Sequence, residues 1–356
     1  MAHRAVADSP ARERKRKPTW RRILSAAISV AIVVGVFAYA IPQIADYGEV
    51  LDTIQTLTPI ELWSLVGVTV LNLISYWLAN MAALPGLGFW QAAIVTQTTT
   101  SVANTLPAGG AIAVGLTYQI LRSWGFSGTD VALYVSVTGL WNIFAKLALP
   151  IVSVGVLVVS GEGGGAFVVA ALIGLVVLAI AVGILAALFS SGRLARRIGD
   201  IAGRVISWFR KLFRKDPVTD MGDRAVRFRE DTIGLVRSRW LWLTIATVGS
   251  HLMLFAVLLL SLRHVGVSQA EVSTAQALAV FAFGRLISAL PVTPGGLGVI
   301  ELGYIGGLRA AAGEAEAAAV VAAVLLFRLL TYVVQIPIGA FTYLLWRRST
   351  RGDVPA

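Results

Sequence analysis

The stretch ALPVTPGGLGVIELGYIGGL, residues 289–308, places two prolines, a Gly-Gly pair and a glutamate inside an apolar segment. The chain is 57% hydrophobic and 14% charged, whereas a soluble domain carries about 25% charged residues. This composition indicates an integral membrane protein, in which backbone groups left unpaired in lipid cost several kcal/mol each. The stretch therefore predicts a broken helix that is buried in protein or lines a wet cavity.

The predicted fold class is an all-α integral membrane protein, because apolar runs of about 20 residues recur along the chain. We expect about six full transmembrane helices, at 23–44, 60–83, 129–158, 166–189, 240–262 and 315–346, and two re-entrant pairs of broken helices, or eight crossings by hydropathy count. The predicted segments are a disordered basic cytoplasmic tail at 1–22, a first membrane half at 23–190 with a re-entrant pair at 89–124, a basic amphipathic cytoplasmic loop at 191–239, a second membrane half at 240–346 with a re-entrant pair at 272–313, and a cytoplasmic tail at 347–356. Two alternatives stay open: each re-entrant pair as two full crossings, and signal-peptidase cleavage after AYA at 38–40.

The charge pattern predicts the orientation. The net charge of +11 is concentrated at 4–22, 193–239 and 347–351, all flanking predicted spans. Basic residues of this kind stay in the cytoplasm and contact anionic lipid headgroups, so both termini are expected to be cytoplasmic in a plasma-membrane protein, and nucleic acid is not an expected partner.

Several site classes are excluded by the residues themselves. The chain has no cysteine and only three scattered histidines, so we expect no metal and no cofactor. No nucleotide-binding loop, HExxH pattern or paired-carboxylate motif in a soluble domain occurs, and no segment outside the membrane is long enough for a catalytic domain. The sequence therefore predicts that the chain is not an enzyme.

An internal repeat relates the two halves. NTLPAGGAIAVGL (104–116) resembles SALPVTPGGLGVIEL (288–302), and the predicted topology gives the two units opposite orientation. Inverted repeats with interrupted helices place a transport-type site near the membrane midplane, so the breaks at 107–110 and 294–298 are expected to approach each other, one from each side. The candidate headgroup-binding residues of the first half are Asn104, Pro107, Gly109, Gly110 and Lys146.

The second half supplies the charges least expected in apolar surroundings. Its candidate headgroup-binding residues are Arg285, Pro294, Gly295, Gly296, Gly298, Glu301 and Arg328. Two arginines and one glutamate leave a net positive charge that a lipid phosphate would balance, and a half-helix starting at Gly298 would add N–H donors. A structural Glu–Arg pair is the alternative. Neutral hydrogen bonds to a sugar or glycerol headgroup would come from Gln97, Asn104, Tyr118 and Asn142.

The segment GRLISALPVTPGGLGVIELGYIGGL (284–308), followed by LLFRLLTYVVQIPIGAF (325–341), resembles the transmembrane region of lysylphosphatidylglycerol synthases, a flippase-like family. The family pattern PxTPGGLGxxE matches Pro291 through Glu301, and Arg328 matches a later family arginine. The resemblance covers roughly 20–346, and the chain looks actinobacterial. AIAVGLTYQ (111–119) replaces the charged residues that often follow the first-half signature, which leaves headgroup specificity open.

The resemblance implies a multi-pass inner-membrane protein that helps translocate an anionic phospholipid or a polyprenyl-linked glycolipid. Lipid lysylation is not expected, because the aminoacyl-transferase domain of the bifunctional synthases is absent. Two alternatives stay open. One is a membrane scaffold or accessory subunit for a cell-envelope glycosyltransferase, and the other is an ion-coupled carrier for a small solute.

Overall fold

The computed structural model of the chain is all α-helical over the residues that it describes. These are residue 31, residues 34–106, 108–162, 190–212, 219–289, 293–313 and 316–351, and scattered positions between 169 and 183. The predicted all-α membrane class is confirmed. The predicted tail at 1–22, residues 23–30, 32 and 33 of the first predicted span, and most of the predicted span at 166–189 lie outside the described residues, so those predictions stay untested.

Within the described part, four helical stretches are long and apolar enough to cross a membrane. They are α3 (Pro59–Ala83), α6 (Gly128–Val159), α9 (Met221–His264) and the run Ala317–Thr350. This last run joins α12 (Ala317–Arg328), a π-helical turn η4 (Leu329–Val333) and α13 (Gln335–Arg351). The four correspond to the predicted spans at 60–83, 129–158, 240–262 and 315–346.

Local sequence explains where several of these helices begin. Thr58 accepts the N–H of Glu61 while the Glu61 carboxylate accepts the N–H of Thr58, a reciprocal cap with Pro59 in the first turn of α3. Ser127 and Asp130 cap α6 in the same way. Each cap satisfies backbone donors that the helix itself leaves unpaired, and so fixes the point at which the chain becomes helical.

The two regions predicted to be re-entrant are hairpins of short helices. The first is α4 (Phe89–Thr105) followed by α5 (Gly109–Ser123). The second is α10 (Thr274–Ile287), a 3₁₀ turn η2 (Pro294–Gly296) and α11 (Val299–Ala312). At 1.5 Å per residue, helices of 14 to 17 residues are roughly 21–26 Å long, less than the ~30 Å hydrocarbon core. Each arm is therefore too short for a perpendicular crossing, as the sequence predicted.

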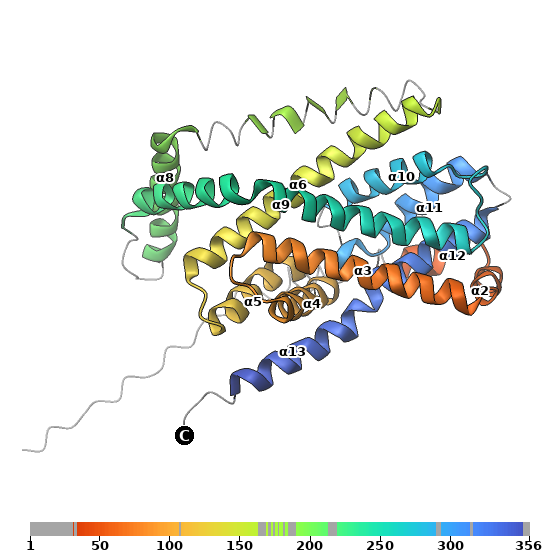
Figure 1. Cartoon of the computed structure of the whole chain (residues 1–356), viewed down its shortest axis with the longest axis horizontal. Coiled ribbons are helices and arrows are strands. Elements are labelled where there is room, and N and C mark those ends of the chain that lie inside the picture. The colour runs from red at the N-terminus through yellow and green to blue at the C-terminus, as the bar shows by residue number, and fades with distance from the viewer. Residues whose placement is uncertain are drawn as a thin grey trace, which may run out of the picture.

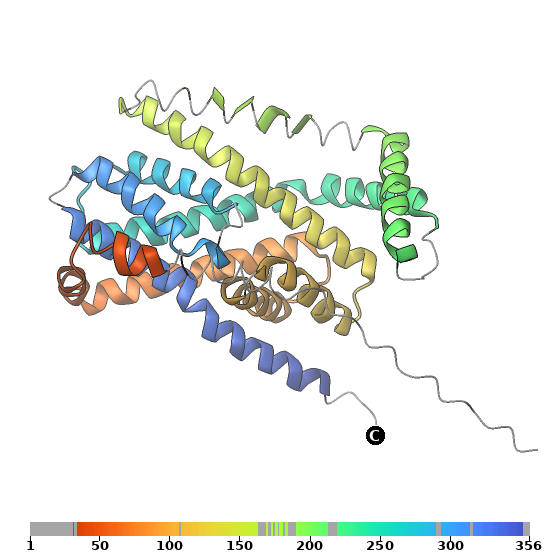
Figure 2. The ribbon, with the colours of Figure 1, turned by 180° about the vertical axis from the view of Figure 1, so that it is seen from behind.

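The hairpins start from opposite ends of the molecule. The C-terminal end of α9 contacts the N-terminal end of α3, where Ser64 Oγ lies 2.7 Å from His264 Nε2, and α10 follows α9. The first hairpin follows the other end of α3 and is linked to α13 by a bond from Trp346 Nε1 to Ser123 Oγ. Figures 1 and 2 show α10 and α11 at one end of the long axis and α5 with the tip of α13 toward the other. This opposite placement matches the predicted inverted repeat.

The predicted boundary between residues 239 and 240 lies inside one continuous helix, α9. The sequence analysis ended the cytoplasmic loop at 239 and began a membrane half at 240, but α9 runs unbroken through that point for 44 residues. Its charged first part packs against the basic helix α8 (Gly192–Leu212), with Arg196 Nη2 2.6 Å from Asp223 Oδ1. The apolar span therefore extends as one helix beyond the predicted boundary (Figure 1), since no proline lies between Met221 and His264.

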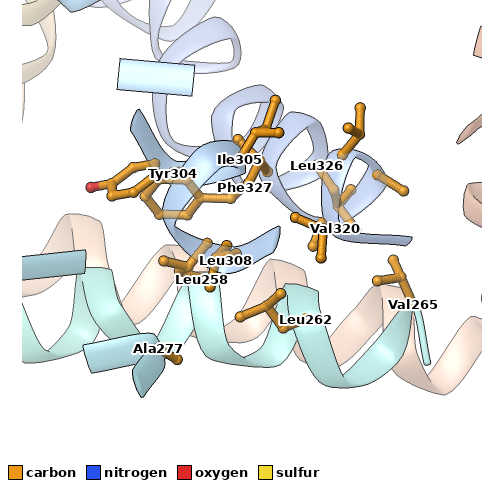
Figure 3. Packing of buried hydrophobic residues seen from close by; sticks show 14 of the residues in the cluster. Leu258, Leu262, Val265, Ala277, Tyr304, Ile305, Leu308, Val320, Leu326 and Phe327 are labelled. Atoms are coloured by element: carbon orange, nitrogen blue, oxygen red, sulfur yellow. The ribbon is translucent and has the colours of Figure 1, made fainter. Parts of the chain in front are cut away.

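The main hydrophobic core packs the second hairpin against α9 and α12. Figure 3 shows Leu258 and Leu262 of α9 beside Tyr304 and Leu308 of α11. Small residues permit the close approach of α10 and α11: a Cβ on Gly307 would lie 2.8 Å from a Val280 methyl carbon. This packing holds η2, the break in the second hairpin, at a fixed place inside the protein. The remaining described helix before α3 is α2 (Tyr47–Gln55), preceded by the π-helical turn η1 (Val36–Ala40).

Candidate functional site

A cavity of about 480 Å³ lies where the two hairpin tips meet. Residues 108–110 of the first break and 293–296 of the second line it, so both halves of the repeat contribute to one space. Three cationic side chains, Lys146, Arg285 and Arg328, also line it. The structure thus brings together most of the sequence-predicted site residues. Pro107 of this set lies outside the described residues, and so does Pro291 of the family pattern.

The first break is formed by a left-handed residue followed by a tightly placed glycine. Ala108 has a φ of 56°, and the chain turns there from α4 into α5. A Cβ on Gly109 would lie 2.5 Å from the carbonyl oxygen of Val102, so only glycine fits. No side chain caps the start of α5, and Gly109 and Gly110 line the cavity. The positive end of the α5 dipole therefore faces the cavity.

The second break needs glycine for its backbone conformation. Gly295, Gly296 and Gly298 have φ values of 58°, 71° and 86°, in the region that side chains disfavour. A Cβ on Gly295 would lie 2.2 Å from the Tyr332 ring. The PGGLG pattern is therefore required both by the turn and by the close approach of η4.

The two tips share a single hydroxyl. Tyr332 Oη donates toward the carbonyl oxygen of Asn104 at 2.6 Å and that of Pro294 at 3.2 Å. These carbonyls belong to the first and second hairpin respectively, so Tyr332 bridges the two breaks. The predicted approach of the breaks is confirmed. Sequence reasoning missed Tyr332, although its i+4 spacing from Arg328 put both side chains on one helix face.

Glu301 and Arg328 form a buried ion pair. Arg328 Nε lies 2.6 Å from Glu301 Oε1, and the glutamate is 0% exposed. The other carboxylate oxygen accepts the N–H of Gly298 at 2.7 Å, while Arg328 Nη2 donates to the Gly295 carbonyl at 3.3 Å. The pair thus connects the end of α12 to the start of α11 and to η2. The structural Glu–Arg pair that the sequence analysis gave as an alternative is therefore present, between Glu301 and Arg328.

Gly298 differs from its predicted role. The N–H that was expected to bind a phosphate donates to Glu301, so the carboxylate of the chain itself occupies the start of α11. Neither Gly298 nor Glu301 lines the cavity. The free helix start at this site belongs to α5 in the first half.

Arg285 lines the same cavity as Arg328 but does not join the Glu301–Arg328 ion pair. It forms no ion pair among the described residues, and its buried Nε has no hydrogen-bond partner there. Its guanidinium instead lies close enough to Lys146 for the two charges to repel. Lys146 likewise has no anionic partner in the described part of the chain. The cavity therefore carries two cations that no described residue neutralises.

The neutral residues proposed from sequence divide into two groups. Gln97 and Asn104 line the cavity. Tyr118 and Asn142 do not; Tyr118 is half exposed, and Asn142 donates to the carbonyl of Thr138 on its own helix. Among the described residues, no group of acidic and histidine side chains could hold a metal ion.

A protein-family model matches most of the chain. The family model described as lysylphosphatidylglycerol synthase TM region matches residues 26–339. A search of curated proteins found no match. The matched residues include both hairpins, the glycine-rich second break and the Glu301–Arg328 pair. The chain therefore belongs to the lysylphosphatidylglycerol synthase transmembrane-region family, as a multi-pass membrane protein.

Proposed function

We propose that the chain translocates an anionic phospholipid or a polyprenyl-linked glycolipid across the plasma membrane, with the headgroup passing through the cavity between the two breaks. On this proposal the chain is a transporter and not an enzyme. Its cargo is the lipid, whose acyl or prenyl chains stay in the surrounding bilayer.

The observation that carries the proposal is the uncompensated charge of Lys146 and Arg285. Insertion scales put a cation at the centre of a membrane helix at about 2.5–3.5 kcal/mol. Glu301 neutralises Arg328, but no described carboxylate neutralises the other two cations. A phosphate or diphosphate entering the cavity would remove this cost, whereas a neutral solute would not. The uncapped start of α5 supports the same ligand, since helix N-termini favour anions.

The distribution of charge at the two ends supports an orientation. Near the first hairpin lie α8 and the C-terminal arginines Arg347 and Arg348, whereas acidic residues such as Glu61 and Glu271 lie at the other end. By the positive-inside rule, we infer that the first hairpin opens from the cytoplasm and the second from outside. A headgroup bound between the tips would then have a route to either leaflet.

The test is lipid translocation by the full chain reconstituted in vesicles of neutral lipid with a trace of fluorescent phosphatidylglycerol. Headgroup accessibility to a membrane-impermeant quencher reports the rate. Lys146→Ala/Arg285→Ala should abolish translocation, because the cavity loses its net positive charge. Arg347→Ala is the matched control: this arginine stacks on Tyr343 away from the cavity and should leave the rate unchanged.

Variants of the ion pair extend this experiment. Arg328→Ala and Glu301→Ala should also abolish translocation, because each leaves a buried charge unpaired beside the break. Arg328→Lys should retain part of the rate, since it keeps the charge and loses the fork of donors. Translocation at the parental rate by well-folded Lys146→Ala/Arg285→Ala would refute the proposed function.

A further inference from the structure

The basic helix α8 contacts α9 through a face of small residues. A Cβ on Gly199 would lie 2.4 Å from the carbonyl oxygen of Met221, and a Cβ on Gly203 would lie 2.9 Å from the Met221 side chain. Because these glycines carry no side chain, the two helices cross in close contact. Figures 1 and 2 show α8 lying across the N-terminal end of α9. This contact uses one face of α8 and leaves the opposite face outside the crossing.

The opposite face of α8 carries an exposed apolar stripe. Ile198, Ile201 and Trp208 have 43%, 46% and 64% of their surface exposed. In the sequence, apolar residues recur at positions 194, 198, 201, 205, 208 and 212, in alternating steps of four and three. A helix with this heptad spacing packs its apolar seam against a partner helix, as in a coiled coil. The stripe therefore has the pattern of a helix-binding surface.

The bilayer lies too far from α8 to cover this stripe. The apolar part of α9 begins at Trp240 and Trp242, two exposed side chains of the kind that mark a membrane interface. The crossing with α8 is at residues 221–225, and α9 is continuous from there, so Ala225 lies roughly 22 Å from Trp240 along the helix axis. At a tilt of about 40° this height is still roughly 17 Å, whereas the headgroup layer of one leaflet is only about 5–8 Å thick.

Arginines border the stripe on one side only. Arg197 and Arg204 are exposed and occupy the same flanking position of successive heptads, whereas the other flanking position holds Ala195 and Ala202. With two further arginines and Asp200, they line an open pocket between α8 and α9. A second copy of α8 would bring arginine against arginine in an antiparallel pair and arginine against alanine in a parallel pair. A helix with acidic flanking residues is the complementary partner.

We propose that the apolar stripe of α8 binds an acidic amphipathic helix of a partner protein, which lies in the cytoplasm in the orientation inferred above. The partner's apolar residues pack on Ile198 and Ile201, and its carboxylates pair with Arg197 and Arg204. The charged part of α9 holds this surface away from the bilayer, where a soluble protein reaches it. The stripe is separate from the cavity between the hairpin tips, so the docking and the proposed translocation can fail independently.

The experiment uses two synthetic peptides of three heptads as probes. Both have isoleucine and leucine on the seam, and one carries glutamate and the other lysine at all flanking positions, so that each peptide repels itself. Their binding to the full chain in nanodiscs of neutral lipid is measured by fluorescence anisotropy. The parental chain should bind the glutamate peptide at least tenfold more tightly, because Arg197 and Arg204 attract one peptide and repel the other.

Two variants of exposed residues separate the seam from the charges. Ile198→Asp/Ile201→Asp should lose at least tenfold in affinity for the glutamate peptide, because it places carboxylates on the apolar seam. Arg197→Glu/Arg204→Glu should reverse the preference in favour of the lysine peptide. Arg237→Glu/Arg348→Glu is the matched control: it changes the net charge equally at two exposed arginines outside α8 and should keep the parental preference.

A fluorophore at position 201 tests the membrane as the occupant. The chain has no cysteine, so Ile201→Cys gives a single labelling site. The emission of an environment-sensitive label should be the same in neutral and anionic nanodiscs and should shift to the blue when the glutamate peptide binds. A blue shift in anionic nanodiscs without peptide would place the stripe in the membrane and overturn the inference.

The remaining outcomes also decide the inference. A dimer of the parental chain in analytical ultracentrifugation that Ile201→Asp dissociates would make a second copy the occupant and overturn it. Equal binding of the two peptides, binding of neither, or a preference that Arg197→Glu/Arg204→Glu leaves unchanged would overturn it as well. None of these results bears on translocation, which the vesicle assay tests separately.

Discussion

Removing both partners of the Glu301–Arg328 pair should destabilise the protein by less than the sum of the two single removals. Glu301→Ala leaves the guanidinium without its carboxylate at a site where the arginine side chain is only 12% exposed. Arg328→Ala leaves a carboxylate that is 0% exposed and that keeps, among the described residues, the Gly298 N–H as its one donor. Breaking a buried pair in this way costs about 3–5 kcal/mol. Each single variant should therefore lose that much free energy of unfolding.

The double variant Glu301→Ala/Arg328→Ala carries neither charge. Its loss should fall below the sum of the single losses by about 2–3 kcal/mol, the upper part of the range for coupled residues. The assay is unfolding by SDS in mixed micelles, followed by fluorescence of the native tryptophans. Because Arg328 also donates to Gly295, the arginine variant should lose slightly more than the glutamate variant. Additive losses, or single losses below about 1 kcal/mol, would show that the two charges do not depend on each other.

Three further predictions follow from the packing, the tip contact and the orientation. Gly339→Ala should lower the melting temperature by several degrees, because the new Cβ would lie 2.3 Å from the Gln97 carbonyl oxygen. Gly155→Ala, whose Cβ would have nothing within 4 Å, should leave the melting temperature unchanged, and equal melting temperatures of the two variants would contradict the tight α4–α13 crossing. Tyr332→Phe removes the hydroxyl between the two hairpin tips and should lower the free energy of unfolding by about 1 kcal/mol, measured by the same SDS unfolding. An unchanged free energy of unfolding would mean that the hydroxyl does not hold the tips together. In intact cells, Ala270→Cys should react with an impermeant thiol reagent while Asp220→Cys should not, and the reverse pattern would invert the orientation.

Sequence predicted the broken helices because their signal is local. Proline and paired glycines inside an apolar run cannot continue a helix, and Gly295, Gly296 and Gly298 do adopt the left-handed conformations that this implies. The likeness of the two repeats then predicted that the breaks would meet. Both inferences needed only the order of residues within one segment or the comparison of two segments.

The ion-pair partner of Glu301 could not be predicted from such local patterns. Arg285 precedes Glu301 by 16 positions and Arg328 follows it by 27, and such separations along the chain do not indicate which arginine pairs with the glutamate. Which arginine pairs is decided by packing: Arg328 at the end of α12 reaches the start of α11, whereas Arg285 lies beside Lys146, 139 positions earlier in the chain. The partners of Thr98 and Ser101 on α4 likewise depend on where α13 crosses that helix.

The junction of the two hairpin tips has an electrical consequence. In the proposed orientation, water that follows each half-length hairpin inward would carry the bulk potential with it, and the membrane voltage would fall across the thin layer between the tips rather than across the full bilayer. Each elementary charge that crosses 100 mV gains or loses about 2.3 kcal/mol. With Lys146 and Arg285 beside this layer, the focused field acts on them and on any phosphate that they bind. Transport of an anionic headgroup through such a layer would depend on voltage over a few ångströms of travel.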